Sequence, residues 1–421
     1  MTLEILEKGA TLQRDMTAIR TSSRPFYVVA SFVLLALTAS STPTPIYSLY
    51  AAKWHFSALT VTEVYGVYAV CVLLALLLAG GASDLIGRKP VLLAGLAGLL
   101  GAELVFIFAG GLDALYAART IQGLATGLLL GATGAALIDH HPRRDGAQAG
   151  LVNGIASGLG IGLGAFVSSV LVQYAPAPEV TPYVVIAVLT ALAIAAAWRL
   201  PETVLGERRL TLTPQVPKVP RSLWRTFSLS ALGVLASWAV GGLYLSLGPG
   251  IVASMLSTSN HVAGGFFVCV CSALAAAAQW VLRGKSNRVV LVGGAATLAA
   301  GSAIAAVGIG ASSTAAFLAG SALMGVGFGG AFMGALRSLA VVLPPAHRAT
   351  VMSAFFVVAY AAISIPAIGA GIAAVHIGLD SAAAWFGGAV SVVAAVVAVV
   401  GWYELRPRRD AARAARELAR A

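Results

Sequence analysis

Charged residues are scarce in this chain of 421 residues, and their scarcity limits the possible fold classes. Asp, Glu, Lys and Arg together make up 10% of the sequence, whereas 59% of it is hydrophobic. A soluble domain carries about 25% charged residues, so this chain has too few to cover a water-soluble fold of its length. The deficit indicates that lipid is the solvent for most of the outer surface.

Recognisable sites for chemistry are also missing. The three cysteines, Cys71, Cys269 and Cys271, lie in apolar runs without the spacing of a disulfide framework or a metal site. Neither a GxxxxGK[ST] nucleotide loop nor an HExxH zinc motif occurs. His140 and His141 precede a proline and two arginines, and we interpret them as solvated residues of a basic loop. We therefore expect no enzyme activity, no cofactor, no metal site and no direct use of ATP.

Long apolar runs are what the chain has in abundance. A bilayer core of about 30 Å requires about 20 helical residues. Backbone groups in lipid must be paired within the segment, and the runs lack the alternation of barrel strands, so we expect helices. Twelve runs qualify: 26–48, 61–82, 90–110, 114–138, 148–172, 182–200, 226–247, 262–282, 289–309, 314–340, 350–374 and 381–402. The sequence thus predicts an all-α integral membrane protein with twelve transmembrane helices.

The distribution of Lys and Arg orients these helices. With the N-terminus in the cytoplasm, all 27 basic residues fall in cytoplasmic segments except Lys53, which lies outside, and Arg119, which lies within a span. Cytoplasmic loops carry an excess of Lys and Arg, so we expect both termini in the cytoplasm. The polar start of the chain lacks the apolar segment and cleavage site of a signal peptide.

The longest cytoplasmic loop is rich in proline and basic residues and separates six spans from six. We interpret it as a linker between two halves. The predicted segments are an N-tail (1–25), an N-terminal half (26–200), the linker (201–225), a C-terminal half (226–402) and a C-tail (403–421).

The two halves show weak internal similarity. A shift of 203 residues superposes Gly127 on Gly330, Gly131 on Gly334 and Pro142 on Pro345. Two six-helix halves related as parallel repeats are a transporter design, with the substrate site at their interface.

The clearest motif is the segment GGASDLIGRK, which begins at Gly80 between the second and third spans. Gly80 lets another helix approach closely, and Gly87 permits a tight turn with positive φ. Asp84 can accept hydrogen bonds from a helix N-terminus or pair with a basic residue. Arg88 and Lys89 can anchor the turn at the cytoplasmic surface. A plain turn with charges that set topology is the alternative.

This segment resembles the signature loop of the major facilitator superfamily (MFS), a family of membrane transporters. The resemblance implies the MFS fold, and a loop that latches the cytoplasmic side in the outward-facing state. Asp84 would be the latch acceptor and Arg88 a partner. In the fourth span, RTIQG from Arg119 to Gly123 resembles the RxxQG pattern of the family, which implies a role for Arg119 in proton coupling.

Arg119 and Glu103 are the most conspicuous charges within the apolar spans. Each lies about six residues from the outer end of its helix, or about 9 Å deep. Such charges usually face the bundle interior, although Arg119 could instead snorkel to the outer headgroups. We hypothesise that the two form an ion pair or share a proton-responsive network. A static pair that holds two helices together is the alternative.

Glycines at a spacing of four in the fifth span, Gly154, Gly158 and Gly162, allow close helix crossing. Proton antiporters of the resembled family often carry GxxxGPxxGG here, but this chain has Leu159 in place of the proline. Pro366 in the eleventh span belongs to a partial echo of that pattern. Tight packing is the alternative for both spans.

The end of the first span carries two prolines, which free backbone carbonyls and bend a helix. In the family, the first, fourth, seventh and tenth spans line the central cavity. The resemblance therefore implies Thr42, Tyr47, Gln122, Trp238 and Tyr244 as lining residues. Both tyrosines could instead be anchors at the membrane interface.

Few charges inside the spans favour proton-coupled efflux, by an antiporter, of a drug-like or hydrophobic compound. Proton-coupled uptake of a sugar or organic acid by a symporter, and a receptor or scaffold without transport, are the alternatives. The expected partners are a small-molecule substrate, protons and the lipid bilayer, with no nucleic acid. We expect a monomer in the bacterial inner membrane.

Overall fold

The computed structural model describes residues 23–204, 216–344 and 347–405. Within these ranges twelve helices are long and apolar enough to cross a membrane. The predicted all-α, twelve-span architecture is confirmed. Most of both predicted tails, the middle of the predicted linker and Pro345 lie outside the described residues.

The helices of the N-terminal half are α2 (Arg24–Ser41), α3 (Tyr47–Trp54), α4 (Ala58–Ala79), α5 (Ala82–Ile86), α6 (Arg88–Ile107), α7 (Leu112–His140), α8 (Gly146–Tyr174) and α9 (Thr181–Trp198). Those of the C-terminal half are η1 (Arg221–Leu223), α10 (Trp224–Ser246), α11 (Gly248–Met255), α12 (His261–Leu282), α13 (Asn287–Gly310), α14 (Thr314–Val342), α15 (Arg348–Ile377) and α16 (Leu379–Glu404).

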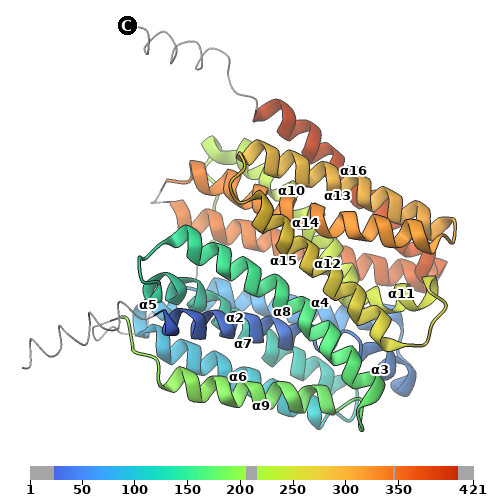
Figure 1. Cartoon of the computed structure of the whole chain (residues 1–421), viewed down its shortest axis with the longest axis horizontal. Helices are drawn as coiled ribbons and strands as arrows, with labels where there is room; N and C mark the ends of the chain where they lie inside the picture. The colour runs from blue at the N-terminus through green and yellow to red at the C-terminus, as the bar shows by residue number, and fades with distance from the viewer. Residues whose placement is uncertain (1–22, 205–215, 345–346, 406–421) are drawn as a thin grey trace, which may run out of the picture.

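The two halves lie side by side, with α2–α9 in the lower part and α10–α16 in the upper part of Figure 1. The short helix α5 marks one end of the bundle, and α3 and α11 mark the other. We call the α5 end the basic end, because Arg88, Lys89 and Arg283 lie at helix ends there and Arg337 lies in the last two turns of α14. The opposite end is called the far end.

Each half contains the same glycine-mediated helix crossing. A Cβ added at Gly127 of α7 would lie 2.6 Å from the Val72 carbonyl oxygen of α4. A Cβ added at Gly329 of α14 would lie 2.2 Å from the Ala275 carbonyl oxygen of α12. These contacts pair Gly127 with Gly329, so the predicted match to Gly330 is wrong by one residue. Because residues 329 and 330 are both glycines, a shift of either 202 or 203 residues matches Gly127 to a glycine.

The first span is broken into α2 and α3 by the TPTP segment that starts at Thr42. Pro43 has no backbone N–H, so the helical bond to the Ala39 carbonyl cannot form. The Thr44 N–H turns to the Ser41 carbonyl at 3.1 Å, which leaves the Ser40 carbonyl without its usual donor. The predicted freeing of carbonyls is confirmed, and it prepares two acceptors for the site described below.

The glycine crossing yields a stability prediction. Gly127→Ala should lower the thermal stability of the purified protein, because the new Cβ would overlap the α4 backbone and overpacking costs about 1–3 kcal/mol. Gly134→Ala on the same helix is the matched control, since nothing lies within 4 Å of its Cβ position. Thermal unfolding in detergent measures both. Equal melting temperatures for the two variants would contradict this packing.

Candidate transport cavity and buried charge network

A cavity of about 1390 Å³ lies between the two halves. Four helices of the N-terminal half (α2, α4, α7 and α8) and four of the C-terminal half (α10, α12, α14 and α15) contribute to its wall. The wall reaches the basic end, where Gly80, Arg283 and Arg337 line it. A cavity shared in this way between two halves is suited to hold a small molecule.

At the far end the halves touch each other. The Thr44 hydroxyl donates to the Leu245 carbonyl at 2.9 Å, which joins the α2–α3 segment to α10. The backbone N–H of His261 donates to the Gln173 side chain at 3.0 Å, which joins α12 to α8. The cavity therefore faces the basic end and is closed at the far end.

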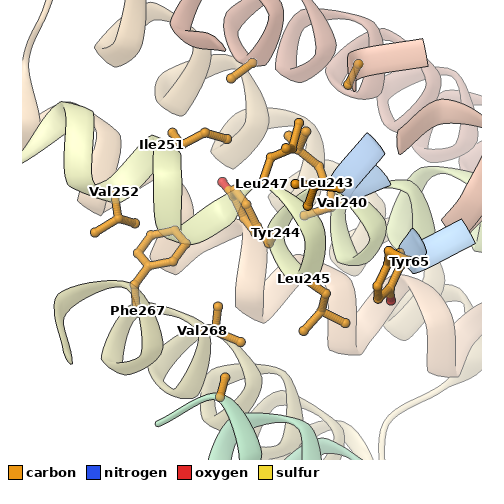
Figure 2. Packing of buried hydrophobic residues seen from close by; sticks show 14 of the residues in the cluster. Tyr65, Val240, Leu243, Tyr244, Leu245, Leu247, Ile251, Val252, Phe267 and Val268 are labelled. Carbon is orange, nitrogen blue, oxygen red and sulfur yellow. The ribbon is translucent and has the colours of Figure 1, made fainter. Parts of the chain in front are cut away.

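Two of the five predicted lining residues, Trp238 and Tyr244, lie in the cavity wall. Trp238 makes an edge contact with Tyr360 at 5.3 Å between ring centroids. Tyr244 packs among apolar side chains and meets Phe267 edge-on at 5.1 Å (Figure 2). Its hydroxyl lies 3.2 Å from the Ser321 hydroxyl.

The other three predicted lining residues, Thr42, Tyr47 and Gln122, do not line the cavity in this conformation. All three are buried inside the N-terminal half. The expectation placed them by helix alone, but their side chains point into the half and not toward its partner. Tyr47 and Gln122 instead bind Arg119.

Arg119 is fully buried, with 0% of its surface exposed. Its Nε donates to the Tyr47 hydroxyl at 2.8 Å, and Nη2 also donates to this hydroxyl. Its Nη1 donates to the Ser40 carbonyl at 2.9 Å and to the Gln122 amide oxygen at 2.5 Å. The snorkelling alternative is wrong, because the donors are satisfied inside the bundle.

Four aromatic rings surround this guanidinium. Its central carbon lies 5.4 Å from the Tyr47 ring centroid, 5.9 Å from Tyr65, 5.1 Å from Tyr68 and 5.9 Å from Phe106. Aromatic faces attract cations at such distances. Tyr65 and Tyr68 also line the cavity, so the charge of Arg119 lies one ring behind the cavity wall.

Glu103 is also fully buried and is linked to Arg119 through Gln122. The Gln122 amide nitrogen donates to Glu103 Oε1 at 3.2 Å and to the freed Ala39 carbonyl at 3.0 Å. The salt bridges among the described residues do not include Glu103 with Arg119, so the direct ion pair predicted as one possibility is wrong. The hydrogen bonds of Gln122 join Arg119 and Glu103 in one network, and the hypothesis that this network responds to protons stays a prediction.

The second carboxylate oxygen of Glu103, Oε2, is buried without a hydrogen-bond partner. An unpaired carboxylate oxygen is costly in an apolar interior. Arginine does not lose its proton in proteins, so a proton can change the charge of this Arg119–Gln122–Glu103 network at the carboxyl group.

The segment that begins at Gly80 forms a compact turn at the basic end. Gly87 has φ +107°, which confirms the predicted positive φ. The Arg88 guanidinium forms salt bridges with Asp84 at 2.5 Å and with Asp139 at 3.0 Å. It also donates a hydrogen bond to the Ser83 hydroxyl at 2.7 Å. These partners of Arg88 all belong to the N-terminal half.

Glu202, which the sequence did not single out, holds this turn. Its carboxylate accepts the backbone N–H groups of Arg88 at 2.9 Å and Lys89 at 3.0 Å, at the N-terminus of α6. A Cβ at Gly87 would lie 2.5 Å from Glu202 Oε2, so glycine is needed for space as well as for φ. Lys89 Nζ donates to the Trp198 carbonyl at 2.5 Å. The signal available in the sequence was an acidic residue at the start of a basic linker.

The glycines of α8 pack against α12 of the other half. A Cβ at Gly158 would lie 3.4 Å from Ala276 Cβ, and one at Gly162 would lie 3.2 Å from Cys269 Cα. Gly154 faces Gln279 in the same way at 2.9 Å. Tight packing is therefore confirmed for these glycines.

Pro366 and the histidines at 140 and 141 were also singled out in the sequence. Pro366 lies inside α15, which continues through it. His140 and His141 are buried, so their predicted solvation is wrong. His141 Nδ1 accepts the backbone N–H groups of Arg143 at 3.2 Å and Asp145 at 3.1 Å, so the basic loop folds back over the ring.

The Arg119 contacts yield a second prediction. Tyr47→Phe should lower thermal stability by about 1–3 kcal/mol, because two donors of a buried cation lose their acceptor. Tyr50→Phe is the matched control: Tyr50 is equally buried, but its hydroxyl makes only long hydrogen bonds of 3.5 Å. We expect a loss of under about 1 kcal/mol for the control. Thermal unfolding of both variants checks this, and an equal loss would contradict a special role for Tyr47.

Comparison with known proteins agrees with this architecture. The family model of the Major Facilitator Superfamily matches residues 29–289. A crystal structure of a mutant of the nucleoside transporter NupG is similar, with a TM-score of 0.68 and 13% identity over 91% of this chain and 100% of that one. At this identity the likeness shows the fold alone. No curated protein matches the sequence. Since the family model covers more than half of the chain, this protein belongs to the Major Facilitator Superfamily and is a membrane transporter.

Proposed function

We propose that this protein is a proton-coupled secondary transporter that exports a drug-like or hydrophobic compound across the bacterial inner membrane. The observation that carries the proposal is the cavity between the halves, whose wall is mainly apolar and aromatic and has no acidic side chain among the residues that the structure describes. The two halves would rock about this cavity and expose it to each side in turn. Apolar and aromatic walls suit hydrophobic compounds.

The orientation of the bundle supports the export direction. We assign the basic end to the cytoplasmic side, since Lys and Arg concentrate on that side of membrane proteins. The cavity then faces the cytoplasm, and a compound to be exported can enter it there or from the inner leaflet. The far-end contact between Thr44 and Leu245 would open after the basic end closes.

The buried network supplies a site for proton coupling. Protonation of Glu103 would remove a negative charge that Gln122 links to Arg119. Arg119 in turn contacts the rings of Tyr65 and Tyr68 in the cavity wall. A change of charge at Glu103 can therefore reach the cavity through three contacts in series.

The turn beginning at Gly80 is proposed as the latch of the basic end. Asp139 and Glu202 hold Arg88 and the start of α6 in a fixed position. This fixed turn would place Asp84 to meet the C-terminal half once the cavity closes on the cytoplasmic side. Gly80 itself lies in the cavity wall, next to the helices that would approach.

Uptake of a polar solute is the second candidate, and one observation favours it. Three amide side chains, Gln148, Asn153 and Gln279, line the cavity. Amides hydrogen-bond sugars and similar solutes well. A receptor or scaffold without transport is the third candidate, and it would explain neither the cavity between the halves nor the buried network of Arg119, Gln122 and Glu103.

Transport is tested with purified protein in liposomes under an imposed pH gradient. A panel of drugs, sugars and organic acids is offered, and flux of compound and proton are both recorded. We expect a hydrophobic compound to move against its own gradient with counterflow of protons. Movement confined to sugars or other polar solutes would contradict export, and no movement of any compound would favour the scaffold.

Substitution of Glu103 tests the coupling. Glu103→Gln keeps the size of the side chain and removes the proton site, so proton flux should become independent of compound. Binding of the compound should persist, since Glu103 does not line the cavity. The control is Glu63→Gln in α4, a half-buried carboxylate that binds the Tyr116 hydroxyl at 3.3 Å outside this network. Unchanged coupling in the Glu103 variant would overturn this assignment.

A further inference from the structure

The formal charges in the cavity wall are all of one sign. Arg283 and Arg337 are the charged residues among the lining side chains that the structure describes, and both lie near the basic end. A cleft with low-dielectric walls focuses the field of such groups and concentrates counter-ions.

Neither arginine is neutralised by an acidic partner among the described residues. The Arg283 guanidinium stacks on the Trp280 ring, with 3.6 Å between its central carbon and the ring centroid. Arg337 Nη2 donates to the Arg283 carbonyl at 3.0 Å. The salt bridges of the described chain include neither residue, so both charges act on whatever enters the cavity.

A third positive charge lies behind the inner part of the wall. The central carbon of the Arg119 guanidinium lies 5.9 Å from the Tyr65 ring centroid and 5.1 Å from that of Tyr68, and both tyrosines line the cavity. The carboxylate that offsets this charge belongs to Glu103, which reaches Arg119 only through Gln122. The arginine is thus the charged group of this network that directly contacts the wall.

Several aromatic rings line the same cavity. Trp238 contacts Phe332 at 5.6 Å and Tyr360 at 5.3 Å between centroids, and all three line the cavity. The indole N–H of Trp238 is buried without an acceptor. Such a donor gains from any group that brings an acceptor oxygen. Flat apolar rings stack on walls of this kind.

We propose that the substrate is an aromatic organic anion, a flat apolar ring system that carries a carboxylate or a similar acidic group. The inference rests on the proposed transport through this cavity and specifies its substrate class. The anionic group would be drawn in by Arg283 and Arg337, and the ring system would stack within the aromatic wall. A lipophilic cation is disfavoured, because the described lining residues include no carboxylate that would offset its charge.

Three probes with one ring body and different charges test the proposal: naphthoate, naphthylmethanol and naphthylmethylammonium. Their affinities for the purified full-length protein are measured at neutral pH and at low and high salt. We expect naphthoate to bind about tenfold or more tightly than the ammonium compound, with the alcohol between them. Salt should weaken naphthoate binding and leave the alcohol unchanged.

Variants then locate the charge effect. Arg283→Gln combined with Arg337→Gln should weaken naphthoate binding about fivefold or more without affecting the alcohol. Arg288→Gln is the matched control, because Arg288 lies near the same end but stacks on Trp402 at 3.9 Å and does not line the cavity. The control should bind all three probes as the wild-type protein does.

Three results would overturn the proposal: tightest binding of the ammonium probe, no binding of any probe, or equal naphthoate affinities in the double variant and the control. Tightest binding of the ammonium probe would refute the charge preference and leave export of a hydrophobic compound standing. The flux experiment judges transport separately, since it depends on no particular probe.

Discussion

The need to satisfy one buried guanidinium shapes the N-terminal half. Arg119 lies among apolar helices, where an unpaired charge would be costly. The prolines after α2 free the Ser40 and Ala39 carbonyls, and these accept hydrogen bonds from Arg119 and Gln122. Tyr47 begins α3 with its hydroxyl on the same guanidinium. Arg119 thus contacts both the break in the first span, through the Ser40 carbonyl, and the cavity wall, through the rings of Tyr65 and Tyr68.

The C-terminal half carries an uncharged side chain at the corresponding position of α14. The glycine contacts that pair Gly127 with Gly329 place Ser321 at the position of Arg119. The Ser321 hydroxyl lies 3.2 Å from the Tyr244 hydroxyl of α10. One half therefore holds the titratable network, and the other supplies a neutral partner. In the proposed mechanism, the N-terminal half binds the proton and both halves share the substrate.

The sequence predicted the spans and the turn at Gly87 well, because apolar run length and glycine geometry are local properties. It also predicted that the prolines would free carbonyls. It could not assign Thr42, Tyr47 and Gln122 to the interior, because the direction of a side chain within a bundle depends on helix rotation. Glu202 was missed because its contact with the start of α6 joins residues far apart in the chain. The one-residue error at Gly330 arose from adjacent glycines, which only packing distinguishes.

The most direct test of alternating access follows distances at both ends of the bundle. Spin labels replace exposed residues of opposite halves in a variant without native cysteines, at Arg143 and Lys285 for the basic end and at Ala52 and Ser312 for the far end. Pulsed electron paramagnetic resonance in lipid nanodiscs then compares neutral with acidic pH, with and without substrate. The account predicts opposite changes: when the basic-end distance shortens, the far-end distance lengthens. Distances that stay fixed in every condition, or change in the same direction, would contradict it.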